Sequence, residues 1–315
     1  MTEALLPDPR ADRDRRPVRG YLMVTAAALL FAVNGAVSKV ILANGVSSPR
    51  LAEVRSTGAL VVLAAGILLM RPRLLRIGRR ELAFLAVFGI AGLAAVQLFY
   101  FLAIHRIAIG IALLLQYLAP LLVALWARYA MHEPVRRRIW VALACALAGL
   151  GLMVEVWNGL ALDAAGVVYA LAAALAYATY ILLAERAVGR RDPFSVSFYG
   201  FLFSALLWAI VQPWWSFPGA VAGRDTSLLG HLDGVHAPVW ALMAWMVLLG
   251  TIAPFGLVVA ALRDISATRA GIVAMLEPVA GTLVAYVWLG ETLGAVQLAG
   301  GVVVLAGILL AQTAR

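Results

Sequence analysis

Residues 266–289 read SATRAGIVAMLEPVAGTLVAYVWL, an apolar stretch with one acid, Glu277, and one proline, Pro278, at its centre. About 20 residues of this character are enough for a helix to cross a bilayer. Both central residues are unusual there, because a carboxylate is costly in lipid and a proline interrupts the helical hydrogen bonds. The stretch therefore predicts a transmembrane helix whose centre has a special role.

Apolar stretches of similar length recur along the whole chain of 315 residues, which is 64% hydrophobic and 13% charged. Soluble domains contain roughly 25% charged residues. Only helices and closed barrels satisfy their backbone in lipid, and these stretches lack the two-residue alternation of barrel strands. We therefore predict an all-α membrane protein. Its ten expected transmembrane helices span residues 20–43, 50–70, 82–103, 107–129, 139–156, 163–185, 194–213, 238–261, 266–289 and 293–312.

The basic residues, 24 arginines and one lysine, alternate between loops on the two sides of the predicted bundle. One side, which includes both chain ends, holds most of them, whereas the opposite loops hold only Arg50, Arg106 and Arg224. Cytoplasmic loops are enriched in Lys and Arg, so both termini are predicted to be cytoplasmic in a multi-pass protein of the inner or plasma membrane. The same distribution favours the lipid bilayer over nucleic acid as the partner of the net charge of +9.

An internal repeat relates the two halves of the chain. The sequence Leu118-Ala119-Pro120 is followed by Glu133 at the same distance as Leu276-Glu277-Pro278 is followed by Glu291, an offset of 158 residues. Near the start of each half, an offset of 146 relates residues 26–29 to residues 172–175. Each half holds five spans, an odd number, so the second copy must be inverted in the membrane. The expected parts are a tail at 1–19, a first repeat at 20–156 and a second repeat at 163–312.

Two sets of segments make this chain resemble the EamA-type family of the drug/metabolite transporter superfamily. The first set runs from Phe99-Tyr100-Phe101-Leu102-Ala103 through Leu115-Gln116-Tyr117-Leu118-Ala119-Pro120 to Gly149-Leu150-Gly151, and the second from Leu276-Glu277-Pro278 through Leu289-Gly290-Glu291-Thr292 to Gly300-Gly301. The resemblance implies two inverted five-helix repeats around a central substrate cavity, with the fifth and tenth helices peripheral. It also implies export of amino acids, nucleobases, other metabolites or toxic compounds. His132-Glu133-Pro134 departs from the Gly-Glu-Arg that many relatives have there.

Glu277 is the first candidate for a functional residue, because an acid at membrane depth usually faces a partner or a wet cavity. It could bind a coupling proton or the amine of a substrate. The alternative is a neutral acid that braces the kink at Pro278. Ala119 occupies the equivalent position of the first half, so a purely repeated structural role does not explain the acid.

Arg55 is the second candidate, since its guanidinium can bind a substrate carboxylate with two hydrogen bonds. The alternative partner for Arg55 is Glu53 within the protein. Lys39 is expected at similar depth, where it could also pair with Glu53, or could extend its long side chain to the membrane interface.

Further polar and aromatic residues lie at membrane depth and are candidates for lining the cavity. Asn34 and Tyr180 are related by the offset of 146, as are Phe31 and Tyr177. The alternative is that they simply pack between helices, where polar groups also need partners. The remaining candidates are Gln97, Tyr100, Gln116 and Tyr117.

Small residues recur at one-turn spacing in the fifth and tenth spans, at Ala142, Cys145, Gly149, Gly300 and Gly307 among others. Such faces let helix backbones approach closely. They predict packing within the bundle, with a homodimer contact as the alternative.

The leading functional hypothesis is a secondary transporter that exports small metabolites such as amino acids, with aromatic amino acids as the first expectation. No phosphate-binding loop is present, so the substrate gradient or protons would supply the energy. A broad-specificity drug or nucleobase exporter is the alternative. An intramembrane enzyme is disfavoured by the lack of His-Glu-x-x-His and Gly-x-Ser-x-Gly motifs, and a receptor without transport by the inverted repeat. With one cysteine and four histidines, no metal or cofactor is expected.

Overall fold

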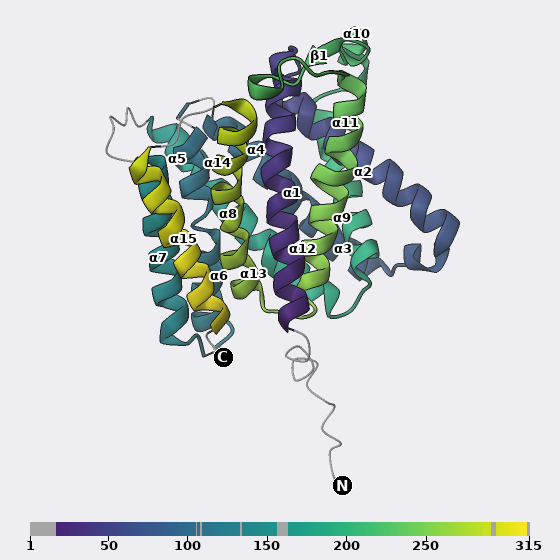
Figure 1. Ribbon diagram of the computed structural model, residues 1–315. Coiled ribbons are helices and arrows are strands. Elements are labelled where there is room, and N and C mark those ends of the chain that lie inside the picture. The colour runs from purple at the N-terminus through teal and green to yellow at the C-terminus, as the bar shows by residue number, and fades with distance from the viewer. Residues whose placement is uncertain are drawn as a thin grey trace.

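The computed structural model describes residues 17–104, 106–107, 109–132, 134–155, 163–290 and 294–313, which form an upright bundle of long helices (Figure 1). Within these residues, nine helical segments are long and apolar enough to cross a membrane, and a shorter apolar helix follows at Ala295–Ala311. The prediction of an all-α membrane protein with ten spans is confirmed.

The first half supplies five spans. They are α1 (Pro17–Ala43), α2 (Ser48–Met70), the composite α3 (Arg79–Val87), η3 (Phe88–Ala94) and α4 (Ala95–Ile104), the pair α5 (Ile109–Gln116) and α6 (Ala119–Tyr129), and α7 (Arg137–Val154). A short 3₁₀ turn, η2 (Pro72–Leu75), follows α2.

The second half repeats this order. It contains α8 (Ala164–Val188), α9 (Pro193–Val211), the composite α11 (Val239–Val247), η6 (Leu248–Ile252) and α12 (Ala253–Ala261), the pair α13 (Ala267–Ala274) and α14 (Leu276–Leu289), and α15 (Ala295–Thr313). The segment between α9 and α11 forms η4 (Trp214–Ser216), α10 (Gly219–Ala222), β1 (Asp225–Ser227), η5 (Gly230–Leu232) and β2 (His236–Pro238). Here β1 and β2 pair antiparallel, a ribbon that was not predicted from the sequence.

The same spans are interrupted in both halves. The π-helical segments η3 and η6 end at Ala94 and Ile252, positions that the offset of 158 relates. The fourth and ninth spans break just before Pro120 and Pro278, because proline lacks an N–H and its ring crowds the preceding turn. At each break an amide bonds only three residues back: the Leu118 amide donates to the Leu115 carbonyl (3.1 Å) and the Met275 amide to the Ile272 carbonyl (3.1 Å).

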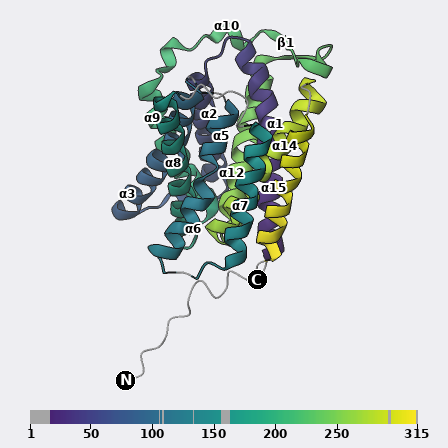
Figure 2. The ribbon, with the colours of Figure 1, turned by 90° about the vertical axis from the view of Figure 1, so that its left-hand side faces the viewer.

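Helices α7 and α15 lie side by side at one edge of the bundle, as the resemblance implied for the fifth and tenth spans (Figures 1 and 2). A Cβ added to Gly149 would lie 2.7 Å from the Gly300 carbonyl oxygen, and one added to Gly307 would lie 2.8 Å from the Ala142 carbonyl oxygen. Since Gly300 corresponds to Ala142 and Gly307 to Gly149, the contact is reciprocal, which requires a two-fold relation between the halves. Moving forward along α7 means moving backward along α15, so the second half is inverted.

A second reciprocal contact lies near the helix starts. A Cβ added to Gly20 would lie 2.8 Å from Ile265, and one added to Gly166 would lie 2.7 Å from Ile107. The repeat offsets relate Gly20 to Gly166 and Ile107 to Ile265. In keeping with inversion, α1 begins and α15 ends at the same end of the bundle, while the β1–β2 ribbon lies at the other end (Figure 1).

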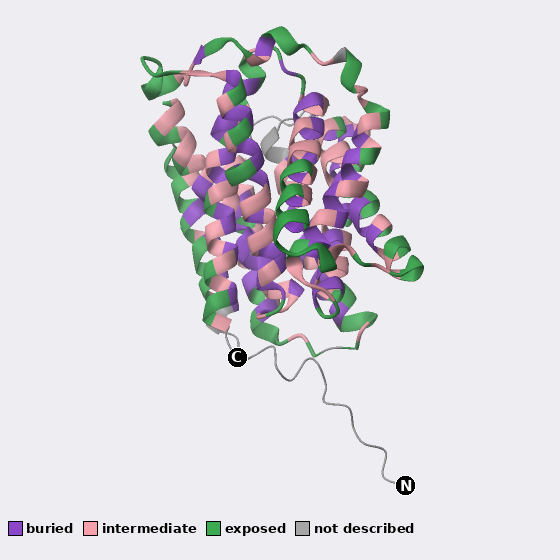
Figure 3. Cartoon of the chain, turned by 90° about the vertical axis from the view of Figure 1, so that its right-hand side faces the viewer, coloured by how far each residue is buried: buried purple, intermediate pink, exposed green. Residues whose placement is uncertain are grey.

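The interior of the bundle is made of buried helix faces, and exposed residues cover the outside, where lipid would lie (Figure 3). Small residues dominate several buried faces, including Ala27 and Ala28 of α1 and Ala173 and Ala174 of α8. Their small side chains let α1 and α8 approach the interrupted spans, because helices in a membrane associate through close packing.

The reciprocal glycine contact makes a prediction for stability. Replacing Gly149 with Leu should lower the apparent melting temperature in detergent by about 5 °C, because the new side chain meets the α15 backbone. Gly151 lies on the same helix with no atom within 4 Å of its Cβ position, so Gly151→Leu is the matched control. Equal melting temperatures for both variants would contradict this packing.

Candidate functional site

Glu277 lies in the first turn of α14, immediately after the helix break, where the positive end of the helix dipole favours an acid. Its carboxylate accepts a hydrogen bond from the Tyr117 hydroxyl at the equivalent break of the first half. The Arg55 guanidinium and the hydroxyls of Tyr100 and Tyr177 lie within electrostatic range of it. These five residues come from both halves, so the inverted arrangement creates a shared polar centre.

The side chains of Arg55 and Glu277 are half-buried, although both lie within membrane spans. The Arg55 Nε donates a hydrogen bond to the Thr251 hydroxyl (3.2 Å), which donates to the Met246 carbonyl (2.8 Å). Arg55 therefore does not take Glu53 as its partner, which was one of its two predicted roles. Opposite charges held within electrostatic range at membrane depth are suited to a molecule that itself carries both charges.

Glu53 is instead the partner of Arg50, a pair that was not considered from the sequence. Arg50 is the first residue of the predicted span 50–70 and was also counted with the loop before it; the structure places it in the first turn of α2, where both side chains are buried. The physical reason is that burial of an arginine is tolerated when a carboxylate and carbonyls satisfy it. Lys39, the other predicted partner of Glu53, is exposed on α1.

An aromatic chain leads from Glu277 into the centre of the bundle. Tyr117 meets Tyr177 edge to face with ring centroids 6.4 Å apart, and Tyr177 stacks on Tyr180 at 6.2 Å. Tyr180 then meets Phe255 at 5.8 Å, and Phe255 meets Phe31 at 5.1 Å. The repeat-related residues Phe31 and Tyr177 thus belong to one aromatic wall, which runs from Tyr117 at one end to Phe31 at the other.

Asn34 and Tyr180 both pack against the π-helical segments. A Cβ added to Gly250 of η6 would overlap the Asn34 side chain, and one added to Gly92 of η3 would lie 3.0 Å from Tyr180. Gly92 and Gly250 are also related by the offset of 158, so this contact is reciprocal as well. The structure thus brings the predicted pair to equivalent places in the two halves.

Several buried polar atoms near this centre have no hydrogen-bond partner among the described residues. They include the Asn34 Oδ1, the Gln97 Oε1, the Gln116 Oε1 and the Tyr180 hydroxyl. The Gln97 Nε2 donates to the Leu93 carbonyl (3.4 Å), which leaves its oxygen directed elsewhere. Unpartnered acceptors of this kind can bind the N–H or O–H groups of a polar ligand.

Two arginines tie α2 to α9 at opposite ends. Arg50, at the start of α2, donates to the carbonyls of Gln212 (3.4 Å) and Pro213 (3.1 Å) just after α9 and lies over the Phe217 ring. We call this contact the Arg50 latch. It lies at the end of the bundle that carries the β1–β2 ribbon, next to the carbonyls that follow α9.

Arg191, just before α9, forms the corresponding contact at the other end. It donates to the Leu74 carbonyl (3.1 Å) and the Arg76 carbonyl after α2, pairs with Glu81, and lies over the Tyr199 ring. We call this contact the Arg191 latch. An arginine at the start of α2 thus binds carbonyls that follow α9, and an arginine just before α9 binds carbonyls that follow α2. Both contacts are formed in this conformation.

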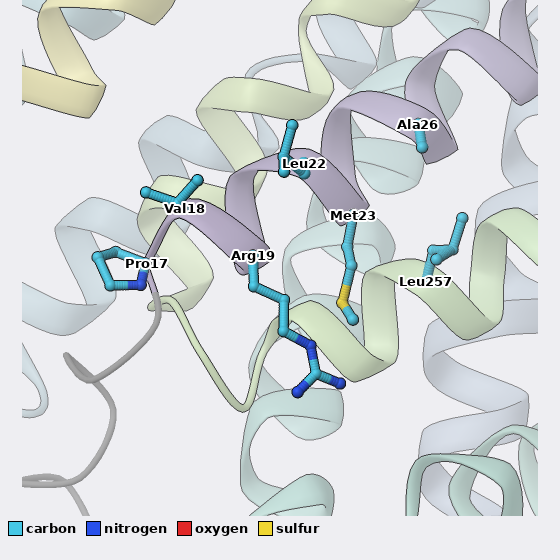
Figure 4. Close-up of a pocket in the computed structure, with 7 residues that line it drawn as sticks. All are labelled: Pro17, Val18, Arg19, Leu22, Met23, Ala26 and Leu257. Atoms are coloured by element: carbon cyan, nitrogen blue, oxygen red, sulfur yellow. The ribbon is translucent and has the colours of Figure 1, made fainter.

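The interior holds a small void of about 10 Å³ beside the aromatic chain, enough for about one water molecule. Its lining residues are Phe88, Leu93, Tyr180, Ser197, Phe201, Phe255 and Val259. A groove of about 650 Å³ lies at the outer surface of α1 and α12 and is lined in part by Arg19 (Figure 4). Arg19 also pairs with Asp264 (3.6 Å). That groove contains exposed residues such as Val18 and Leu22, so it belongs to the outer surface of the bundle.

The chain matches the EamA-like transporter family over residues 18–155 and 164–313. It belongs to this family. Both stretches correspond to one five-helix half each, in agreement with the inverted repeat. The resemblance drawn from the two Pro-containing segments is therefore confirmed.

Similar proteins include an uncharacterized transporter of Archaeoglobus fulgidus, 31% identical over 78% of this chain and 82% of its own length. The threonine/homoserine exporter RhtA of Salmonella typhimurium is 28% identical over 81% of this chain and 77% of its own. A crystal structure with a TM-score of 0.74 and 20% identity covers 93% of this chain and 96% of that chain, which shows the shared fold.

Glu133, Glu291 and the first 16 residues, all of which figured in the sequence predictions, lie outside the described residues. The small-residue face of α7 packs on α15 within the chain, as the first alternative predicted. Sequence reasoning missed Thr251, which was a polar residue at membrane depth and so carried the same signal as Asn34. It also missed the hydroxyl pair of Ser56 and Ser204 (3.0 Å) between α2 and α9.

The Arg191 latch makes a prediction about opening. Arg191→Ala should raise amide hydrogen exchange of residues 72–76 at least tenfold, because the carbonyls of that turn lose their donor. Arg190, its exposed neighbour, provides the matched control Arg190→Ala. If both variants exchange like the unmodified protein, the contact does not hold this end closed.

Proposed function

We propose that this protein is a secondary transporter that exports small zwitterionic metabolites of the amino-acid class by alternating access. The observation that carries the proposal is that Arg55 of the first half and Glu277 of the second lie within electrostatic range of each other. A carboxylate on Arg55 and an ammonium on Glu277 would satisfy both charges at once. The similarity to a threonine/homoserine exporter supports the same substrate class.

The aromatic wall suits the remainder of such a substrate. The rings of Tyr117 and Tyr177 flank the polar centre, and the ring of Tyr180 continues the apolar surface. A side chain as large as that of phenylalanine would stack on them, whereas a small polar side chain would use the free oxygens of Gln97 or Gln116. Aromatic amino acids are therefore our first expectation within the class.

Alternating access follows from the two-fold relation. Rocking one half against the other exchanges the two ends of the bundle, so the Arg50 latch and the Arg191 latch would open in turn while the centre stays between them. From the arginine distribution we place both termini in the cytoplasm and the protein in the inner or plasma membrane. The Arg191 latch then closes the cytoplasmic end.

A broad-specificity exporter of aromatic cations is the second candidate, favoured by Glu277 beside three tyrosine rings. The two candidates differ in their need for Arg55. A cation without a carboxylate would use Glu277 and the aromatic wall but would be repelled by the guanidinium.

Flux measurements in proteoliposomes test the function. Radiolabelled threonine and phenylalanine should both exchange across the membrane, and Arg55→Gln should reduce kcat/KM at least tenfold, since a charge-assisted hydrogen bond contributes about 1.5–3 kcal/mol. Transport of phenethylamine, which lacks the carboxylate, should not fall on the same substitution and should rise, because a repelling positive charge is removed. Arg224→Gln, outside the spans, is the control. Transport of phenethylamine in preference to both amino acids would favour the second candidate.

Proton coupling is tested at Glu277, the acid at the centre of the site. If protons drive export through this carboxylate, Glu277→Gln should abolish the pH dependence of flux, because an amide cannot bind a proton in its place. The measurement is the initial flux across a series of imposed pH gradients, with Glu185→Gln on the end of α8 as control. If the flux through Glu277→Gln still depends on pH, this residue is excluded as the proton carrier.

A further inference from the structure

We propose that Thr251 is a positioning residue for Arg55 and that the π-helical segment η6 exists in part to aim its hydroxyl. The inference rests on the proposed function, in which Arg55 binds the substrate carboxylate. It assigns substrate specificity to a residue that would not itself contact the substrate.

The Thr251 side chain is 1% exposed, deep within the eighth span, and its hydroxyl acts in both directions. It accepts from the Arg55 Nε at 3.2 Å and donates to the Met246 carbonyl at 2.8 Å. A buried hydroxyl with both roles satisfied favours one orientation, because rotating it would break a hydrogen bond. The Arg55 Nε is therefore held by a fixed acceptor.

The direction of the Thr251 hydroxyl differs from that of other threonines in this chain. Thr179 and Thr282 each donate to the carbonyl four residues back, at 2.8 and 2.9 Å, as is usual within an α-helix. Thr251 donates to the carbonyl five residues back, the spacing of a π-helix. The wider turn of η6 therefore rotates this residue relative to the rest of the span, which is how its hydroxyl comes to accept from α2.

Packing holds η6 against the helix that carries Arg55. A Cβ added to Gly58, one turn after Arg55 on α2, would lie 2.6 Å from Val247, the residue before η6. On the other side, Gly250 lies against the Asn34 side chain of α1. Since η6 is confined between α1 and α2, the Thr251 acceptor keeps its place relative to the Arg55 backbone.

The hydrogen bond from Arg55 Nε to Thr251, which we call the tether, leaves the two terminal nitrogens of the guanidinium for a ligand. In the described part of the chain, Nε is the Arg55 nitrogen that has a hydrogen-bond partner. The two terminal nitrogens form the fork that matches a carboxylate, and holding Nε fixes the plane of that fork. A carboxylate would then bind in one geometry, at lower entropic cost than on a freely rotating arginine.

The first half shows that a π-segment does not itself need this threonine. The offset of 158 relates Thr251 to Leu93, and η3 forms with Leu93 in place. The reciprocal contacts of Gly58 with Val247 and of Gly200 with Gly89 relate Arg55 to Ser197. Leu93 and Ser197 line the small void, so the guanidinium and its tether occur in one half only. The hydroxyl is thus a departure from symmetry at the place where a charged ligand would bind.

The test compares Thr251→Val, which removes the hydroxyl at nearly constant shape, with Thr251→Ser, which keeps it. Purified protein is titrated with threonine, phenylalanine and their methyl esters, and binding is followed by thermal stabilisation. For the two acids, Thr251→Val should weaken binding about tenfold and Thr251→Ser less than twofold. For the esters, which lack a carboxylate, all variants should match the unmodified protein. Thr179→Val is the control for loss of a threonine hydroxyl within a span.

The outcomes separate this inference from the proposed function. Equal weakening of acids and esters by Thr251→Val would mean that the residue only supports the fold, and unchanged binding of both would mean that it has no role; either overturns the inference. If Arg55→Gln abolishes the preference for acids over esters while Thr251→Val does not, the proposed function stands and only the tether is wrong. If Arg55→Gln also leaves the preference unchanged, or if neither acid binds, the proposed function fails and this inference with it.

Discussion

Glycine allows the two halves of this protein to touch backbone to backbone, and the same pairs of positions are used from both sides. Gly149 of α7 packs on the α15 backbone and Gly307 of α15 packs on the α7 backbone, while Gly92 packs against Tyr180 and Gly250 against Asn34. Lipid offers no hydrophobic force to bring helices together, so close packing of this kind must do so. Because each of these contacts has a counterpart in which the two halves exchange roles, the halves are related by a two-fold rotation, and the second half is inverted.

The interruptions of the helices lie where that two-fold relation brings them together. In lipid, an interrupted helix would leave backbone groups unsatisfied, so such segments are tolerated only inside the protein. Here the break before Pro278 places Glu277 in the first turn of α14, and the break before Pro120 places Tyr117 between α5 and α6. The symmetry builds the scaffold, and the departures from it supply the chemistry, since Ala119 stands opposite Glu277 and Leu93 stands opposite Thr251.

Much of this could be predicted from the sequence, because lipid imposes simple rules. Span length, the duplicated Leu-x-Pro segments and the odd number of spans per half led to the inverted bundle. Glu277, Arg55, Tyr100, Tyr117 and Tyr177 were found as polar groups at membrane depth, and the structure brings them together. What was missed was the partner of Glu53: Lys39 and Arg55 were considered for it among other roles, whereas Arg50 lies one turn from Glu53 on the same face of α2.

The π-helical segments could not be predicted from sequence patterns. These spans are apolar on all sides, so one extra residue in a turn leaves no visible change in the spacing of their apolar residues. Thr251 carried the same signal as Asn34, a polar group at membrane depth, but its contact with Arg55 depends on the wider turn of η6, which the sequence does not reveal. The most direct test of the account is the topology of the chain itself, measured with compartment reporters fused at residues 1 and 315 and inserted between β1 and β2. Inverted halves of five spans each predict both ends in one compartment and the ribbon in the other. Chain ends found in different compartments would contradict the inverted repeat, and with it the shared centre of Arg55 and Glu277.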